Sequence, residues 1–197
     1  GVKQGEENPE SDDSAELGAQ ESTMYRAVVA RGIYLAQDRT DIQYAVKELS
    51  RRMSSPKERD WASLKRFGRY LIGKERYRQL FEYQDWEGKI AVWTDTDFAG
   101  CRETRKSTSG GVVYLGRHVV KTWSTTQSVI ALSSGEAEYY GMVKGGSVGL
   151  GIKAILGDLG VRKGIKIKTD ASAAKGIATR KGLGKVRHLE VNLLWLQ

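Results

Sequence analysis

The hydrophobic pattern of the chain changes near Tyr77, from the repeat of a helix to the short runs typical of β-strands. Before that point, apolar residues recur every three or four positions, which predicts helices. Beyond it, β-branched and aromatic runs bounded by turn residues predict strands at 77–84, 89–95, 107–116 and 118–125. A helix at 133–159, a strand at 165–170, a helix at 171–180 and a short apolar helix at 188–197 are predicted next. Antiparallel strands followed by alternating helix and strand indicate an α/β fold with a mixed sheet and flanking helices.

The part before this change divides into an acidic segment and a helical one. Residues 1–20 contain almost no large apolar side chains, so we expect a disordered acidic linker. Residues 21–75 predict three helices, and the third begins at SPKE, where Ser55 and Glu58 fit a capping box. The remaining residues, 76–197, make up the predicted α/β domain.

Positive charge is concentrated outside the first 21 residues. Of the 32 basic and 24 acidic residues, one basic and seven acidic lie in 1–21, which leaves 31 and 17 and a net charge of +14. A basic globular body favours a polyanion as partner, most often nucleic acid, although a soluble basic protein without such a partner is the alternative. The third helix has a basic face (Lys57, Arg59, Lys65, Arg66 and Arg69), which fits either phosphate contact or plain solvation.

Several classes of protein are excluded by composition. No stretch approaches the roughly 20 apolar residues that a membrane-spanning helix needs, so we expect no membrane partner. The one cysteine, Cys101, excludes an internal disulfide framework and a cysteine-based zinc site.

Two predicted strands end in an aspartate, Asp95 and Asp170, and Glu136 lies near the start of the long helix. Functional groups of open α/β sheets collect at the C-terminal ends of strands. Three carboxylates at one edge repel one another unless a cation neutralises them, and Mg²⁺ prefers oxygen ligands. The pattern therefore suggests a metal site.

Each of these carboxylates also has a structural alternative. Glu136 fits a capping box with Ser133, Asp170 can cap the helix that follows it, and Asp97 can cap a turn. Spacing alone leaves both interpretations open.

The sequence around these residues resembles that of a known protein family. Residues 93–116 (WTDTDFAGCRETRKSTSGGVVYLG), 123–141 (WSTTQSVIALSSGEAEYYG) and 168–178 (KTDASAAKGIA) resemble, in order, the RNase H domain of copia-type retrotransposon Pol polyproteins. Residues 25–73 are similar to the segment that connects reverse transcriptase to RNase H in those proteins. The resemblance implies an RNase H-like fold for 76–197 and a connector role for 21–75.

The resemblance also implies an activity, cofactors and partners. The activity is a ribonuclease H that hydrolyses the RNA strand of RNA–DNA hybrids with two Mg²⁺ ions, or Mn²⁺ in their place. Asp95 matches the aspartate that bridges both metals, Glu136 the glutamate near the attacking water, and Asp170 the aspartate after the fourth strand; Asp97 is taken as structural. The implied partners are the hybrid and the upstream reverse transcriptase domain of the same polyprotein. The implied location is intracellular, in a cytoplasmic virus-like particle or the nucleus.

The stretch RKSTSGG is our candidate for the substrate edge, because it offers hydroxyls, amides and positive charge beside the first strand of the domain. It contributes Arg105, Lys106, Ser107, Thr108 and Ser109, although a plain hairpin turn needs only its glycines. The hydroxyl-rich residues 124–128 are a weaker candidate for contact with the nucleic-acid backbone.

The chain also departs from the family pattern. The family's fourth carboxylate follows a further strand, and this chain stops at Gln197, so we expect both to be missing and the domain to be C-terminally truncated. Glu190 and His188 are expected to help place the last helix, with proton shuttling by His188 as an alternative. A catalytically inactive remnant that binds only nucleic acid or reverse transcriptase is therefore the competing hypothesis.

The predicted long helix carries an unusual glycine pattern. Gly141, Gly145 and Gly149 recur at four-residue spacing, and each costs about 1 kcal/mol of helix propensity relative to alanine. Their shared face predicts close packing of this helix on the sheet.

Overall fold

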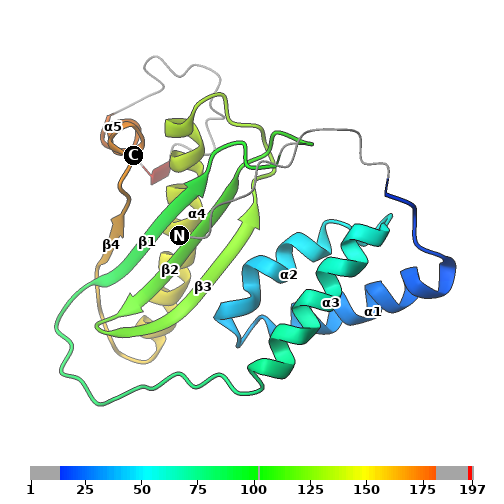
Figure 1. Ribbon diagram of the computed structural model, residues 1–197. Helices are drawn as coiled ribbons and strands as arrows, with labels where there is room; N and C mark the ends of the chain where they lie inside the picture. The colour runs from blue at the N-terminus through cyan, green and yellow to red at the C-terminus, as the bar shows by residue number, and fades with distance from the viewer. Residues whose placement is uncertain (1–13, 102, 181–194, 197) are drawn as a thin grey trace. The chain divides into compact units, whose positions relative to one another are not determined.

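The computed structural model describes residues 14–101, 103–180 and 195–196. It divides the chain into two compact units, Gly1–Tyr77 and Arg78–Gln197 (Figure 1). Each unit has its own hydrophobic core, and each is described here by itself. The predicted helix at 188–197, with His188 and Glu190, lies outside the described residues apart from Trp195 and Leu196.

The first unit is helical, as the apolar repeat predicts. It contains α1 (Ala19–Leu35), a short 3-10 helix η1 (Thr40–Ile42), α2 (Gln43–Ser50) and α3 (Glu58–Gly73). Its core consists of apolar side chains from all of these elements, among them Tyr25, Val29, Ile42, Val46, Leu49, Leu64 and Phe67. The Tyr25 hydroxyl also donates a hydrogen bond to the carbonyl of Leu49, which ties α1 to the end of α2.

The start of α3 differs from the predicted capping box. The Asp60 carboxylate accepts from the backbone N–H of Lys57, whereas Ser55 donates its hydroxyl to Glu16. The chain around Ala15 runs beside this helix start, because Glu58 N donates to the Ala15 carbonyl. Residues 14–18, which we assigned to the acidic linker, are therefore hydrogen-bonded to the start of α3, while residues 1–13 lie outside the described part.

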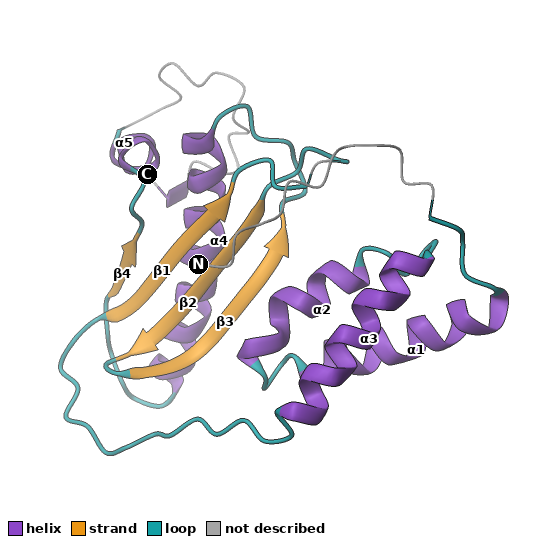
Figure 2. Cartoon of the chain, viewed as in Figure 1, coloured by secondary structure: helices purple, strands orange, loops and turns teal. Residues whose placement is uncertain are grey.

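The second unit is a four-stranded mixed sheet with flanking helices (Figure 2). The strands β1 (Ile90–Asp97), β2 (Thr108–Leu115), β3 (His118–Thr126) and β4 (Ile165–Lys168) lie in the order β3-β2-β1-β4. The β1–β2 and β2–β3 pairs are antiparallel and the β1–β4 pair is parallel. The long helix α4 (Ser134–Asp158) packs on one face of the sheet, and α5 (Ser172–Thr179) follows β4. The prediction of an RNase H-like mixed α/β fold is confirmed.

The predicted strand at 77–84 is not formed; this segment is an irregular connection. Its glutamines bond to the β2–β3 hairpin through their side chains: Gln84 donates to the Leu115 carbonyl, and Gln79 to the Val119 carbonyl. Because side-chain amides make these contacts, the segment lies along the hairpin without joining the backbone ladder.

Glycines explain how closely α4 approaches the sheet. A Cβ at Gly145 would lie 2.5 Å from Cγ2 of Thr94, and one at Gly149 would lie 3.0 Å from Cγ2 of Val92. Both neighbours belong to β1, so the glycine face of α4 rests on that strand. The predicted close packing of helix on sheet is confirmed.

No helix within the described ranges is both long enough and apolar enough to cross a membrane.

Candidate metal centre

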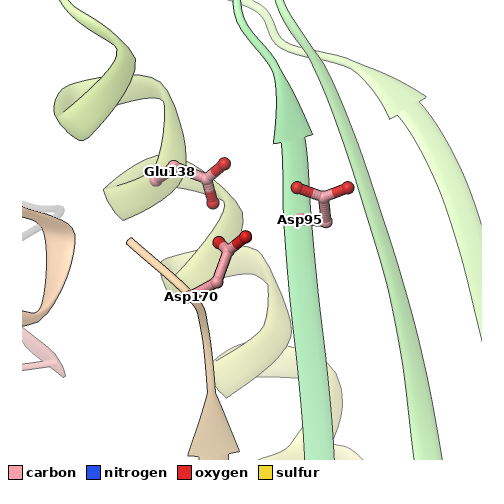
Figure 3. Close-up of side chains that lie close together, drawn as sticks. All are labelled: Asp95, Glu138 and Asp170. Atoms are coloured by element: carbon pink, nitrogen blue, oxygen red, sulfur yellow. The ribbon is translucent and has the colours of Figure 1, made fainter. Parts of the chain in front are cut away.

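Three carboxylates from three different elements meet at one edge of the sheet. Asp95 comes from β1, Asp170 from the residues just after β4, and Glu138 from the second turn of α4 (Figure 3). One ligand oxygen from each lies within 4.8 Å of the others. Among the acidic, histidine and cysteine side chains of the described residues, these three form a group that could hold a metal ion.

The parallel pairing of β1 and β4 explains why the two aspartates meet. In the register of this pair, Trp93 lies opposite Lys168; Asp95 is two residues beyond Trp93 on β1, and Asp170 is two residues beyond Lys168, just after β4. Parallel strands bring their C-terminal ends to the same edge, where functional groups of α/β sheets collect. Asp95 and Asp170 are both exposed, so an ion or substrate can reach them.

Glu138 reaches the aspartates because it lies on the glycine face of α4. It precedes Gly141 by three residues and Gly145 by seven, spacings that repeat on one side of a helix. A Cβ at Gly141 would lie 2.6 Å from the Thr96 hydroxyl, so this face contacts β1 directly. The Glu138 Oε1 accepts a hydrogen bond of 3.1 Å from the backbone N–H of Thr96.

The surroundings of Glu138 disfavour its negative charge. The side chain is only 8% exposed, and among the described residues no hydrogen-bond donor faces its buried Oε2. Burial raises the pKa of this carboxyl, the negative charges of Asp95 and Asp170 raise it further, and the bond from Thr96 opposes them. A cation bound at Oε2 would compensate for the burial of the negative charge and for the repulsion from the two aspartates.

The predicted ligand Glu136 has a different role in the structure. It is buried, with Oε2 accepting from the Leu132 N–H at 3.0 Å and Oε1 from the Tyr140 hydroxyl at 2.5 Å. Its own N–H donates to the hydroxyl of Ser133, the N-cap of α4, which is the capping alternative weighed from the sequence. Residues two apart on a helix point to nearly opposite sides, so Glu136 cannot share the sheet-facing position of Glu138. The structure therefore replaces Glu136 with Glu138 in the carboxylate group.

A sequence signal could have distinguished these two glutamates. The glycine face predicted to contact the sheet contains positions 141, 145 and 149, and extending it by one turn toward the N-terminus reaches 138 and not 136.

Asp97, predicted to be structural, is not in the carboxylate group. Its carboxylate lies against Gly100, where an added Cβ would be 1.7 Å from Oδ2. Any side chain at Gly100 would displace the Asp97 carboxylate, so the two residues together shape the turn after β1.

The five predicted substrate-edge residues differ in accessibility. Ser107, Thr108 and Ser109 are buried, and the Ser107 hydroxyl accepts from the backbone N–H of Ala99. The Ser109 hydroxyl accepts from Gln127. Arg105 is exposed and Lys106 is half-buried. The serine hydroxyls are thus used inside the fold, and the side chains accessible to a substrate are those of Arg105 and Lys106.

The donor set of this centre fits a hard divalent cation. All three groups offer carboxylate oxygens, the ligands that Mg²⁺ and Mn²⁺ prefer. One of these oxygens, Glu138 Oε2, is buried without a donor in the described residues, as a metal ligand would be. Within the described residues, this centre includes neither histidine nor cysteine, which would instead favour zinc or copper.

Comparison with known proteins identifies the family. The chain is 37% identical over 140 residues to the retrovirus-related Pol polyprotein from transposon RE1 of Arabidopsis thaliana, which covers 71% of this chain and 10% of that protein. Identity to the Pol polyprotein from transposon RE2 of the same plant is 36% over 140 residues, with the same shares covered. The chain belongs to the copia-type Pol polyproteins.

A third member of this family aligns over more of the chain. Identity to the Pol polyprotein from transposon TNT 1-94 of Nicotiana tabacum is 27% over 185 residues, 92% of this chain and 14% of that protein. The chain thus spans about a tenth of the length of the curated Pol polyproteins it matches first. No protein-family model matches the chain, and no solved structure does so either.

Proposed function

We propose that this part of a copia-type Pol polyprotein is a ribonuclease H that hydrolyses the RNA strand of RNA–DNA hybrids during reverse transcription. The observation that carries the proposal is the meeting of Asp95, Glu138 and Asp170 at one sheet edge, with one buried carboxylate oxygen lacking a donor in the described residues. The RNase H-like sheet and the family membership support the same reaction.

The centre would hold Mg²⁺, as two ions, with Mn²⁺ as a substitute. Bound divalent ions lower the pKa of a coordinated water and stabilise the leaving oxygen of an in-line displacement at phosphorus. Asp95, on β1, would hold these ions together with the other two carboxylates. Glu138 is held by the Thr96 N–H and offers Oε2, while Asp170 completes the group from the adjacent strand.

A hollow beside the centre gives the substrate room. It has a volume of about 580 Å³ and lies against both aspartates, with Gly110, Val112 and Trp93 among its lining residues. Gly110 pairs with Asp95 across β1 and β2, so no side chain stands beside that carboxylate on the neighbouring strand. We propose that the nucleic-acid backbone enters here.

Positive charge near this hollow suits a phosphate backbone. The Lys168 ammonium lies 4.0 Å from the centre of the Trp93 ring, on the strands that carry Asp170 and Asp95. Arg105 and Lys106 lie in the loop after β1. Selection of RNA over DNA requires contact with the 2′-hydroxyl, the group that distinguishes the two.

The remaining proposals concern partners and location. We propose that the upstream reverse transcriptase of the same polyprotein delivers the hybrid, with residues 21–75 as the connector between the two activities. This assigns the protein to the cytoplasmic virus-like particle or the nucleus.

A strand-specific cleavage assay tests the proposed function. The chain is incubated with Mg²⁺ and a hybrid carrying different labels on its RNA and DNA strands, beside duplex DNA and duplex RNA of the same sequence. We expect fragments of the RNA strand of the hybrid alone, and none when Mg²⁺ is chelated. Binding of the hybrid without cleavage would favour an inactive remnant over an enzyme.

A further inference from the structure

Gln127 joins three elements of the second unit through hydrogen bonds. It directly follows β3, and its side-chain amide donates to the Ser109 hydroxyl on β2 and to the Ala137 carbonyl on α4, both at 2.8 Å. Its backbone N–H donates to the carbonyl of Ser107, also at 2.8 Å. With 9% of its surface exposed, the residue is buried at the junction of sheet and helix.

The orientation of the Gln127 amide follows from chemistry. The Ala137 carbonyl can only accept a hydrogen bond, so the NH₂ group of the amide must face it. The amide oxygen, Oε1, is then buried, and no donor faces it within the described residues. An unsatisfied buried acceptor destabilises a fold. The two hydrogen bonds that the amide donates therefore hold the side chain in place, although its oxygen is left buried without a donor.

Both acceptors of the Gln127 side-chain amide are linked to Glu138. Ala137 precedes Glu138 in α4, and Ser109 pairs with Thr96 across β1 and β2. Thr96 in turn donates its N–H to Glu138. The Gln127 bridge thus spans the same gap between α4 and the sheet that Glu138 itself spans.

This bridge opposes a repulsive force at the metal centre. Glu138, Asp95 and Asp170 carry like charges with ligand oxygens within 4.8 Å, so without a cation they push the start of α4 away from β1 and β4. The interaction of Gln127 with Ala137 resists this displacement at the residue adjacent to Glu138 (Figure 3 shows the three carboxylates).

We propose that Gln127 is a positioning residue of the metal centre: it holds the first turns of α4 on the sheet and so keeps Glu138 in reach of both aspartates. This inference rests on the proposed function, since it treats the three carboxylates as metal ligands. It concerns ion binding, however, and can be tested without measuring cleavage.

The test compares the full chain with Gln127→Met, which keeps the length of the side chain and removes the two hydrogen bonds of its amide. Mg²⁺ affinity is measured by an NMR-monitored titration. Amide hydrogen exchange of residues 134–141 is measured without metal. We expect Mg²⁺ affinity to fall by about tenfold, as for other groups that orient metal ligands. We also expect faster exchange in those first turns of α4, and recovery of any hybrid cleavage at excess Mg²⁺.

Gln84→Met is the matched control. Gln84 also donates to a backbone carbonyl, that of Leu115 at 2.8 Å, and it accepts from the N–H of Arg117 at 2.9 Å. These contacts lie at the β2–β3 turn, at the opposite end of β2 from Ser109. A purely structural role would lower stability in Gln127→Met, as in Gln84→Met, and leave Mg²⁺ affinity unchanged in both.

Two outcomes overturn the proposal. One is Gln127→Met binding Mg²⁺ as tightly as Gln84→Met, with exchange in 134–141 unchanged. If Gln127→Met does not fold, Ser109→Ala takes its place, and we expect it to lose Mg²⁺ affinity by less than about tenfold. The second outcome that overturns the proposal is unchanged Mg²⁺ affinity in Ser109→Ala. A chain that cuts no hybrid, yet binds Mg²⁺ more weakly without Gln127, would contradict the proposed function and support the positioning role.

Discussion

Glu138 is the residue at which folding and the proposed ion binding make opposite demands. Its side chain is buried beside two other carboxylates, with one oxygen lacking a donor in the described residues, so the metal-free fold carries a repulsion at this point. In the proposed function, a bound divalent cation would offset this repulsion. Residue-scale tests can separate these two effects.

Substitution of the two glutamates of α4 should have contrasting results. Glu138→Gln removes a charged ligand and should lower Mg²⁺ affinity by more than the roughly 10–100-fold lost with a supporting residue, while making the metal-free fold more stable. Glu136→Gln weakens bonds to Leu132 and Tyr140 and should cost about 1–2 kcal/mol of stability with little change in Mg²⁺ affinity. Ion titration and chemical denaturation of both variants measure this; the reverse pattern would return Glu136 to the centre.

The stability of the metal-free protein should depend on pH through Glu138. Because burial and nearby charges raise its pKa in the fold above the ordinary value of 4.5, the folded state keeps a proton that the unfolded state has lost. The contribution of Glu138 to stability is therefore fully present below pH 4.5 and is lost as the pH rises through the raised pKa. Urea denaturation in the presence of a chelator measures this slope. Glu138→Gln should lack this contribution to the slope, and an equal slope in that variant would assign it to another group.

At the same scale, the sequence indicated two of the three carboxylates that the structure brings together. Asp95 lies near the C-terminal end of β1 and Asp170 just beyond β4, and because both strands are recognisable in the sequence, these positions could be predicted directly. Glu136 and Glu138 both lie near the same helix start, and the resemblance was carried over to the first, for which capping was the alternative. Which of them faces the sheet depends on the rotation of α4 about its axis, and the glycine face at 141, 145 and 149 is the sequence signal of that rotation.

Among the elements, α4 shows how the fold depends on absent side chains. Its glycine face rests on β1, and the closest contact is at Gly145, where a Cβ would lie 2.5 Å from Thr94 and 3.1 Å from Val92. Both neighbours are buried strand residues that cannot move away freely.

Gly145→Ala should therefore destabilise the second unit, although alanine favours a helix by about 1 kcal/mol over glycine. Overpacking of a core typically costs about 1–3 kcal/mol, and the displaced helix should also bind Mg²⁺ more weakly through Glu138. Gly151→Ala in the same helix is the control, because its Cβ would meet no atom within 4 Å. That variant should be stabilised. Thermal melting of the pair decides, and equal stabilisation of both would show that α4 does not rest closely on β1.

The order of the elements was predictable from the sequence, but one predicted strand, at 77–84, does not form. The alternation of strand-type and helix-type runs is strong over β1 to α5, and the mixed sheet follows from it. The segment 77–84 also alternates, yet Leu80, Phe81 and Tyr83 remain exposed. A strand pattern expresses a fit to a half-buried surface. This segment contacts the β2–β3 hairpin through the side chains of Gln79 and Gln84 and does not pair with it as a strand.

At the scale of the whole molecule, the chain consists of two units with separate cores, joined by an exposed segment. Lys74, Arg76 and Arg78 are all exposed in this connection. Brief trypsin treatment should therefore cut first between 74 and 78 and release two fragments that resist further digestion, because local cleavage requires accessible, weakly packed backbone. Mass spectrometry identifies the cut. First cleavage within α1 to α3 or within the sheet would contradict the division into two compact units.

The central claim is that Asp95, Glu138 and Asp170 together hold the ions that cut RNA. The most direct measurement is the rate of RNA-strand cleavage in an RNA–DNA hybrid with Mg²⁺, for the chain and for Asp95→Asn, Glu138→Gln, Asp170→Asn and Glu136→Gln. We expect cleavage by the unaltered chain and by Glu136→Gln, and loss of at least about 100-fold in each of the other three, since each removes a ligand of the ions that activate water and leaving group. Cleavage that survives Glu138→Gln but is lost in Glu136→Gln would contradict this account.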